Sequence, residues 1–209
     1  MRMEFEQYCQ KIEERLSPDR FAHSLRVVDK ALDLAKQSRC SLDLEKLRLA
    51  ALLHDYAKDM PPEELLSIAF EHGLVTAEAE KVQPDLLHGA VGAFLCRRDL
   101  GMSAADEEIL HAIRYHTTGC EKMSLLDKIV YLADLLEPGR TFAGVDELRR
   151  ICEDDLDAGL LFAFDSTIQY VLSRKLLIHP LTVEARNWLL LDMKKDDSYR
   201  VEEWNGYGK

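Results

Sequence analysis

Residues 44–59 read LEKLRLAALLHDYAKD, a stretch that becomes apolar just before a histidine and an aspartate stand side by side. Its helix formers and the following Pro61 and Pro62 predict a helix that ends near residue 59, with His54 and Asp55 in its last turns. An unpaired carboxylate after such an apolar run would be costly to bury, and a metal ion would offset that cost. The pair therefore predicts a buried metal site near the end of a helix.

The rest of the chain shows the same helical pattern. Ser17 and Pro18 predict the start of another helix, with His23 near its beginning, and apolar residues recur at helical spacing over residues 124–137. No segment alternates apolar and polar residues between turn signals, as a half-buried strand would. We therefore expect an all-α fold whose helices do not pack as a coiled coil.

Length and composition predict one globular domain. The chain has 209 residues, of which 47% are hydrophobic and 31% charged, enough to bury a sizeable core. We expect a single domain over residues 1–195 and a loose C-terminal tail over residues 196–209. No apolar run reaches the roughly eighteen residues of a membrane span, and the N-terminal stretch lacks the apolar centre of a signal peptide. These features favour a cytoplasmic protein with no membrane partner.

Charge and cysteine usage argue against further classes of protein. The formal net charge is -11 and no basic stripe is present, which disfavours nucleic acid as a partner but not a small phosphorylated ligand. The five cysteines are odd in number and scattered, with no CxxC pair. We therefore expect reduced thiols, and neither a disulfide framework nor a structural zinc site.

Candidate metal ligands occur in the order H, HD, H, H, D, each in its own short motif. Imidazole nitrogens and carboxylate oxygens suit divalent first-row metals, and the adjacent His–Asp pair can place a carboxylate between two ions. A lone histidine on a helix is more often a core or surface residue, and we interpret His72 and His111 in that way. The candidates are His23 in FAHSLR, His54 and Asp55 in ALLHDYAKD, His88 in DLLHGA, His116 in RYHTTG, Asp134 in YLADLLEPGR, and additionally His179.

Charged residues near these motifs have both a functional and an ordinary interpretation. Lys58 can neutralise charge on a transferred phosphoryl group, or it is an exposed lysine at a helix C-terminus. Arg26 and Arg140 suit phosphate contacts, with a surface position or a loop-ordering salt bridge as the alternatives. Asp127 orients a histidine or lies on the surface, and Glu137 is a weaker candidate.

Taken together, these motifs resemble a known family. The order of His23, His54, Asp55 and Asp134 is similar to that of the HD-domain metal-dependent phosphohydrolases, whose fold is a helical bundle that holds one or two ions. The segments DLLHG, RYHTTG, ADLLEPGR and the late IHPLTVEARN resemble the YqeK-type symmetrical diadenosine tetraphosphate hydrolases over residues 17–190. The resemblance implies an HD-domain helical bundle.

The resemblance also implies roles for particular residues. Those implied as metal ligands are His23, His54, Asp55 and Asp134, with His88 and His116 at a second metal position. Those implied in catalysis are Asp55, Lys58, His88 and His116. Those implied in substrate binding are His23, Arg26, Asp55, His88, His116, Thr117, Thr118, Asp134, Arg140, Leu177, Ile178, His179, Pro180 and Thr182.

The implied reaction is the symmetrical hydrolysis of diadenosine tetraphosphate to two ADP by a metal-activated water. Iron is the implied metal, as one or two ions per chain, and Mn, Co, Ni or Zn fit the same ligands. The expected partner is a dinucleoside polyphosphate or an ADP-like nucleotide, and a homodimer is an alternative to a monomer. Other functions left open are an HD hydrolase for a mononucleotide or cyclic nucleotide, a nucleotide-binding regulator without turnover, and a helical repeat protein, although no repeat is visible.

Overall fold

The described part of the chain is built from α-helices. The structure, a computed structural model, describes residues 3–38 and 41–195, and these contain no β-strand. The all-α class expected from the sequence is confirmed. Short 3-10 turns at Pro84–Leu87 and Ala104–Asp106 precede α6 and α7. The helices are α1 (Phe5–Glu13), α2 (Pro18–Gln37), α3 (Leu44–Leu53), α4 (Pro62–Glu71), α5 (Glu78–Val82), α6 (His88–Asp99), α7 (Glu107–Tyr115), α8 (Leu125–Leu136), α9 (Val145–Asp154), α10 (Leu156–Ser173) and α11 (Pro180–Lys195).

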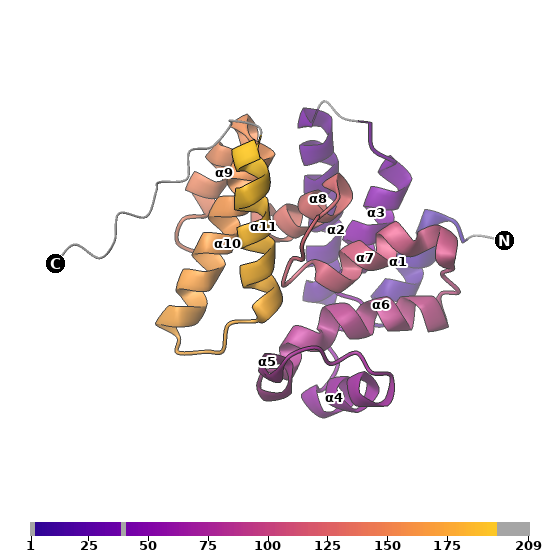
Figure 1. Ribbon diagram of the computed structural model, residues 1–209. Helices are drawn as coiled ribbons and strands as arrows, with labels where there is room; N and C mark the ends of the chain where they lie inside the picture. The colour runs from indigo at the N-terminus through magenta and orange to yellow at the C-terminus, as the bar shows by residue number, and fades with distance from the viewer. Residues whose placement is uncertain (1–2, 39–40, 196–209) are drawn as a thin grey trace.

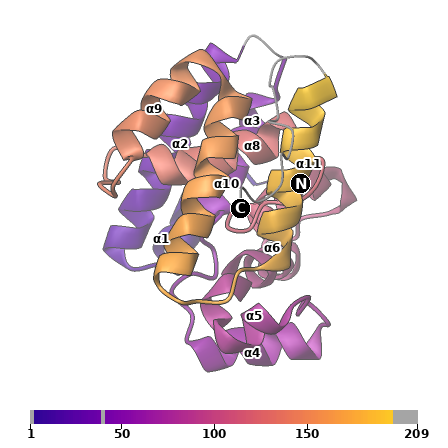
Figure 2. The same ribbon diagram turned by 60° about the vertical axis from the view of Figure 1, so that its left-hand side comes forward.

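Two groups of helices make up the molecule. In the first, α2 packs against α3 and α8, and α7 lies between α6 and α3 (Figure 1). In the second, α10 packs against α9 and α11, and this group contacts α8. α4 and α5 lie together at one end, beside the turn that precedes α6 (Figure 2). α8 is therefore the helix that both groups share.

This shared position explains the sequence of α8. Leu126, Ile129, Tyr131 and Leu132 are all buried, although they point to different sides of the helix. A helix that is apolar around most of its circumference is typical of the interior of a bundle. Such a helix can carry Asp134 only where the carboxylate finds a partner.

α3 ends earlier than the sequence predicts. It stops at Leu53, so the expectation of a helix to residue 59 was wrong. The imidazole Nδ1 of His54 lies 2.8 Å from the carbonyl oxygen of Ala51, which would otherwise accept the next helical hydrogen bond. Tighter turns follow over residues 54–59. His54 and Asp55 therefore stand at the tip of α3 and face the bundle interior.

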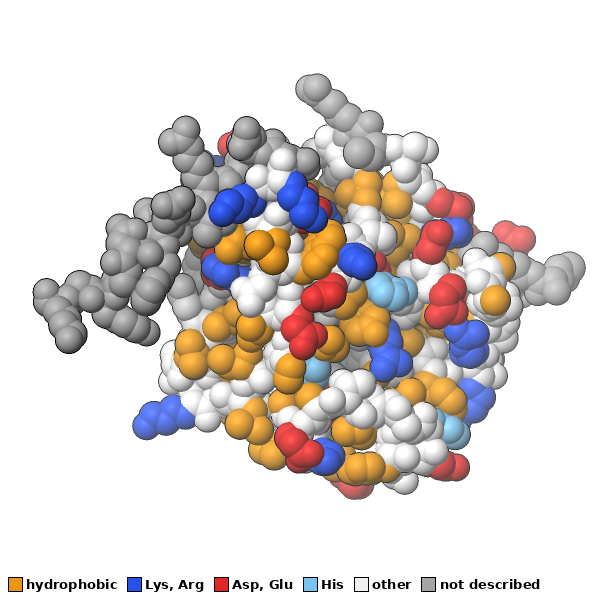
Figure 3. Space-filling model, in the orientation of Figure 1, with side chains coloured by type: hydrophobic (Ala, Val, Ile, Leu, Met, Phe, Trp, Pro, Cys, Tyr) orange, Lys and Arg blue, Asp and Glu red, His pale blue; other side chains and the backbone are white. Residues whose placement is uncertain are grey.

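The sequence also led to expectations about membrane spans, the C-terminal tail and the number of domains. Among the described residues, no helix is both long enough and apolar enough to span a membrane. The expected tail over residues 196–209 lies outside the described residues, and the single domain over residues 1–195 stays a prediction. On the face seen in Figure 3, Lys and Arg side chains are interspersed with Asp and Glu.

Candidate metal centre and active site

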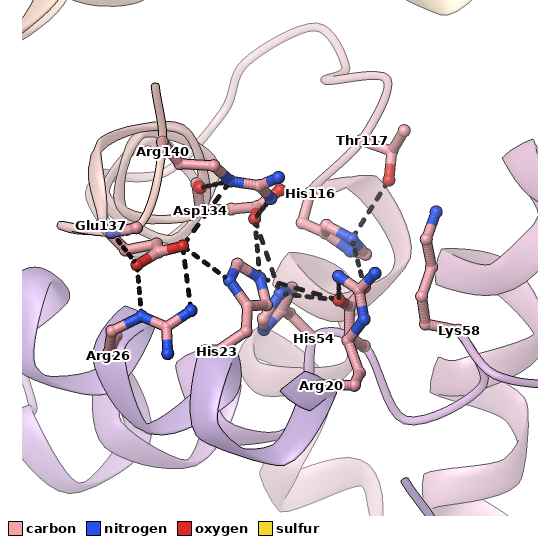
Figure 4. Close-up of polar contacts among 12 residues, drawn as sticks. Arg20, His23, Arg26, His54, Lys58, His116, Thr117, Asp134, Glu137 and Arg140 are labelled. Atoms are coloured by element: carbon pink, nitrogen blue, oxygen red, sulfur yellow. Dashed lines mark hydrogen bonds and ion pairs between the residues drawn. The ribbon is translucent and has the colours of Figure 1, made fainter. Parts of the chain in front are cut away.

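The first group of helices brings the expected metal ligands to one place. The ligands come from α2, α3, α6, α7 and α8, and two of them, His54 and Asp55, follow the end of α3. Figure 4 shows the side chains of His23, His54, His116 and Asp134 pointing toward one another. We call the set the ligand cluster, and it consists of His23, His54, Asp55, His88, His116 and Asp134.

Asp55 stands between two pairs of histidines. Its Oδ2 lies 3.7 Å from Nε2 of His23 and 3.4 Å from Nε2 of His54. Its Oδ1 lies 3.3 Å from Nε2 of His88 and 3.6 Å from Nε2 of His116. One carboxylate thus offers a separate oxygen to each pair, as a residue that bridges two ions does.

The Nδ1 atoms of these histidines are already engaged, and this fixes the state of the Nε2 atoms. Nδ1 of His88 lies 2.5 Å from the backbone oxygen of Asp85, and Nδ1 of His116 lies 2.8 Å from that of Ile113. His54 makes the equivalent contact within α3. A carbonyl oxygen only accepts, so each Nδ1 carries the proton and each Nε2 keeps a lone pair. Histidines that bind metals are oriented in the same way.

These lone pairs face one another and the carboxylates, an arrangement that a cation stabilises. Nε2 of His88 lies 2.9 Å from Nε2 of His116. Nε2 of His23 and Nε2 of His54 are buried and have no hydrogen-bond partner. Three overlapping groups within the cluster have ligand atoms within 4.8 Å of one another. The donor set therefore fits divalent first-row metals.

The ionisation of the cluster points to the same conclusion. Burial disfavours a charge on His54, but the carboxylates of Asp55 and Asp134 raise its pKa above the ordinary value. Burial also opposes ionisation of Asp134, yet the hydrogen bond with His23 and the charges of His54 and Arg140 hold its pKa well below the usual range. The two carboxylates therefore favour a positive charge beside His54, which a bound metal ion would supply.

His116 differs from His54 in its protonation. Burial, reinforced by the neighbouring His88 and His54 and opposed by the hydrogen bond with Asp55, lowers the pKa of His116 to about 4. The imidazole is therefore neutral at pH 7. A neutral imidazole is the form that binds a metal ion.

Residues 20–139 match the family described as HD domain, and this segment is more than half of the chain. The chain belongs to the HD domain family. The matched segment begins just before His23 and ends just after Asp134, so it contains the whole ligand cluster. His54 and Asp55 are the adjacent histidine and aspartate of this HD domain.

Three relatives extend the comparison beyond the HD domain. The chain is 38% identical over 179 residues to "Bis(5'-nucleosyl)-tetraphosphatase, symmetrical" of Bacillus subtilis (strain 168), which covers 86% of this chain and 94% of that protein. It is 37% identical to the protein of the same name from Halalkalibacterium halodurans, with 88% and 96% covered. A crystal structure of a predicted HD superfamily hydrolase involved in NAD metabolism from Clostridium acetobutylicum is 40% identical, with a TM-score of 0.85 and coverage of 92% and 100%. The resemblance and the HD-domain bundle expected from the motifs are confirmed.

Glu137 is more closely tied to the cluster of this HD domain than the sequence suggested. Its Oε1 lies 3.1 Å from Nδ1 of His23, and its Oε2 accepts a 2.6 Å hydrogen bond from Nε of Arg26. Burial opposes its ionisation, but the hydrogen bond from Arg26 and that from the backbone of Gly139 lower the pKa of Glu137 to about 2. Glu137 therefore orients His23 as a carboxylate. Its spacing of three residues from Asp134, one helical turn, was a signal that the sequence offered.

Sequence reasoning missed Arg20. Its Nη1 lies 2.9 Å from Oδ2 of Asp55, so it neutralises the carboxylate at the centre of the cluster. Arg20 precedes His23 by one turn of α2 and shares its helix face. This spacing was the available signal.

Arg26 and Arg140, both expected to bind substrate, are paired with carboxylates of the site. Arg26 contacts Glu137, and the hydrogen bond between them raises the pKa of Arg26. Arg140 donates through Nη2 to Oδ1 of Asp134 and through Nε to its backbone oxygen at 2.8 Å. Both guanidinium groups therefore stand at the edge of the cluster, where the substrate contacts stay a prediction.

The two threonines after His116 are placed differently. Oγ1 of Thr117 lies 3.2 Å from Nε2 of His88 and 3.1 Å from Nε2 of His116, within the cluster. The hydroxyl of Thr118 donates instead to the carbonyl of Gly119 at 3.0 Å. The geometry favours Thr117 over Thr118 as a direct substrate contact.

Lys58 and the turn before α11 lie at one end of the cluster. Nζ of Lys58 contacts Oδ2 of Asp85 at 2.8 Å. Two residues earlier in the chain, Nε2 of Gln83 donates to the backbone oxygen of Leu177 at 3.1 Å. The expected substrate-binding segment, which comprises Leu177, Ile178, His179, Pro180 and Thr182, is therefore next to the Lys58 end.

His179 is not part of the ligand cluster. Its Nε2 lies 3.3 Å from Oε1 of Glu80, and its Nδ1 accepts from the backbone N–H of Leu181 at 3.2 Å. The additional interpretation of His179 as a metal ligand therefore gains no support, whereas its place in the substrate-binding turn stays a prediction.

The remaining histidine expectations agree with the structure. His72 stacks on Phe94 with ring centroids 4.1 Å apart. Asp127 is buried, and its Oδ1 lies 2.9 Å from Nδ1 of His111. It therefore orients a histidine, as one of its two interpretations stated, but this histidine is not a candidate metal ligand. His72 and His111 both lie outside the ligand cluster.

Proposed function

We propose that this chain is a metal-dependent hydrolase that cleaves diadenosine tetraphosphate symmetrically into two ADP. The names of the relatives that match it over most of their length support this substrate and this cut. The observation that carries the hydrolytic part is Asp55, which offers one oxygen to each of two histidine pairs. Mononucleotides and cyclic nucleotides are the alternative substrates, and the nucleotide panel described below includes them.

The proposed cofactor is iron, as two ions held by the ligand cluster. His23, His54 and Asp134 with Asp55 would hold one ion, and His88 and His116 with Asp55 would hold the other. When bound, such ions supply Lewis acidity toward phosphate oxygens and lower the pKa of water. The ligands also fit Mn, Co, Ni and Zn, so elemental analysis of protein purified without added metal identifies the ion.

The protein's own contribution is to bind and align an anionic chain in an acidic molecule. The net charge is -11, yet Arg20, Arg26, Lys58 and Arg140 surround the cluster. Cations gathered around a site attract and orient phosphate whatever the sign of the whole surface. On substrate binding, the guanidinium groups exchange carboxylate partners for phosphate oxygens, and the two-point geometry of arginine favours this exchange.

Thr117 and Lys58 act near the phosphorus that is attacked. The hydroxyl of Thr117 stands beside His88 and His116, where it can donate to a phosphate oxygen. The Lys58 ammonium, once released from the exposed Asp85, can stabilise charge on the departing ADP. Both residues act by hydrogen bonds that strengthen as negative charge develops.

Incubation with a panel of nucleotides tests the proposal. The iron-loaded protein should convert diadenosine tetraphosphate to ADP as the sole nucleotide product and should act poorly on mononucleotides and cyclic nucleotides. AMP with ATP as products would reject the symmetrical cut. Tight binding without any product would instead identify a nucleotide-binding regulator.

Asp55→Asn tests the role of the central carboxylate. The change keeps the shape of the side chain but removes the charge that two cations share, so metal content and hydrolysis should fall together, the latter by at least about a hundredfold. Asp59→Asn, an equivalent change of an exposed residue four positions later, is the matched control. Full activity in the Asp55 variant would refute this role.

A further inference from the structure

A cavity of about 350 Å³ lies beside the ligand cluster in the loop between α8 and α9. Residues 140–147 and Arg149 line it. Its first lining residue, Arg140, is also the residue that pairs with the ligand Asp134. The cavity therefore begins one side chain away from the cluster. Pockets that bind small molecules commonly measure about 300–1,000 Å³, so a nucleoside matches this space.

The lining side chains have the chemistry that recognises a nucleoside next to a phosphate. Arg140 is positioned for a phosphate at the mouth of the cavity. Phe142, whose side chain is held on a loop and is 38% exposed, offers an aromatic face to a purine. Asp146 is 92% exposed and can accept hydrogen bonds from ribose hydroxyls, as acidic residues do in dinucleotide sites.

The loop is held in shape before any ligand arrives. Nη2 of Arg149 donates to the backbone oxygens of Arg140 at 3.1 Å and Glu137 at 3.4 Å, and its Nη1 contacts Asp146 at 2.7 Å. Gly144 ends the loop with a φ of 93°, a left-handed conformation that suits glycine. A fixed loop loses little conformational entropy when a ligand binds.

This cavity lies at the opposite end of the cluster from the turn before α11. In Figure 4, Arg140 and Glu137 stand at one side of the histidines, and Lys58 and Thr117 at the other. The turn at Leu177 adjoins the Lys58 side through Gln83, as described above. Figure 2 shows the α8–α9 and α10–α11 connections well separated. The cluster thus lies between two distinct candidate binding regions.

A symmetrical cut requires such an arrangement. Attack near the middle of a tetraphosphate leaves two phosphates and one nucleoside on each side of the reacting centre. If the turn before α11 holds one ADP half, the other half needs a separate region beside the cluster, and the cavity that begins at Arg140 provides one. Cavities of comparable size beside α4 and α5 and on the outer face of α6 and α7 have no described lining residue paired with a ligand of the cluster.

We infer that the α8–α9 loop cavity is the subsite for the second nucleoside of the substrate, with Phe142 stacked on its base, Asp146 on its ribose and Arg140 on its α-phosphate. This inference rests on the proposed function. The subsite distinguishes a dinucleoside polyphosphate from a nucleoside polyphosphate, because only the former has a base at both ends. Phe142 is accordingly a residue that determines specificity.

Kinetics of Phe142→Ala with two substrates test the subsite. Diadenosine tetraphosphate carries two adenosines, whereas adenosine 5'-tetraphosphate carries one and can place it at the turn before α11. The variant should raise KM for the former about tenfold, the effect expected for one stacked base, with kcat unchanged. KM for the latter should change much less. Phe142→Trp should keep the low KM for the dinucleotide.

Phe70→Ala provides the matched control. Phe70 is 57% exposed and lies on α4, away from the cluster, so its removal should alter neither KM. Equal KM values for wild-type protein and Phe142→Ala with both substrates, while ADP is still produced, would overturn the subsite and leave the proposed function intact. Failure of the wild-type protein to produce ADP would instead reject the proposed function.

Discussion

Glu137 shows how one residue outside the ligand cluster sets the state of a ligand. It holds Nδ1 of His23 and is itself held by Arg26. Glu137→Gln keeps the size but removes the charge, so metal affinity should fall about ten- to a hundredfold, as is usual when a partner of a metal-binding histidine is lost. Metal titration of the apoprotein measures this. The exposed Glu153→Gln is the control, and unchanged affinity in Glu137→Gln would contradict the role.

His111 makes a separate contribution to stability that depends on pH. Its hydrogen bond with buried Asp127 and its contact with Cys120 raise the pKa of His111 to about 10. An unfolded histidine titrates near about 6.5, so the stabilisation is fully present below that pH and is lost as the pH rises through about 10. The free energy of unfolding should therefore be lower for His111→Gln than for wild type at pH 6, and this difference should disappear by pH 10. Urea denaturation at both values measures the difference, and a difference that is independent of pH would disprove the linkage.

The sequence predicted the ligands of the cluster better than their supporting residues. His54, Asp55 and Asp134 each follow an apolar run in the sequence, where a polar or charged residue is unusual. Arg20 and Glu137 are ordinary charged residues in sequence. The packing of α2 against α3 brings Arg20 to Asp55, and the packing of α2 against α8 brings Glu137 to His23. Charged residues that act through tertiary neighbours carry little local signal.

The contact between α6 and α7 depends on a glycine. A Cβ built at Gly89 would lie 2.7 Å from the backbone oxygen of Arg114, so Gly89→Ala should force the two helices apart and displace His88. Such overpacking costs about 1–3 kcal/mol of unfolding free energy. The same change at Gly92 meets nothing nearer than 3.6 Å and should be neutral or stabilising, because alanine favours helix. Chemical denaturation of both variants tests this, and equal stabilities would argue against the close approach.

Helix starts were predictable where proline or a capping residue marked them, as at Pro18 and Ser124. The end of α3 was not. There the imidazole of His54 contacts the carbonyl oxygen of Ala51 at 2.8 Å, and the helix ends at Leu53, before the prolines. His54, a candidate metal ligand, thus also contacts the last turn of the helix, a coupling that propensity alone does not predict.

For the molecule as a whole, the cluster joins α2, α3, α6, α7 and α8 through buried nitrogen and oxygen atoms that a cation would hold together. Metal binding should therefore stabilise the fold, by about 2.7 kcal/mol at a free metal concentration one hundred times Kd. Chelation should lower Tm in a calorimetric scan of wild-type protein. Asp55→Asn should show little response to chelator, and an unchanged Tm in wild type would contradict this coupling.

The sequence predicted the class of fold and the HD domain family, because buried helices and the histidine and aspartate motifs have local patterns. It could not predict the α8–α9 loop cavity. Arg140, Phe142 and Asp146 form a lining only when the loop is closed by Arg149, and such closure depends on backbone geometry. Metal identity and oligomeric state likewise depend on conditions beyond local sequence, and they stay predictions.

Anomalous diffraction at the iron edge, from crystals of iron-loaded protein, tests the central claim most directly. Two peaks should flank Asp55, one among His23, His54 and Asp134 and the other between His88 and His116. A single peak away from Asp55, or no peak within the ligand cluster, would contradict the account.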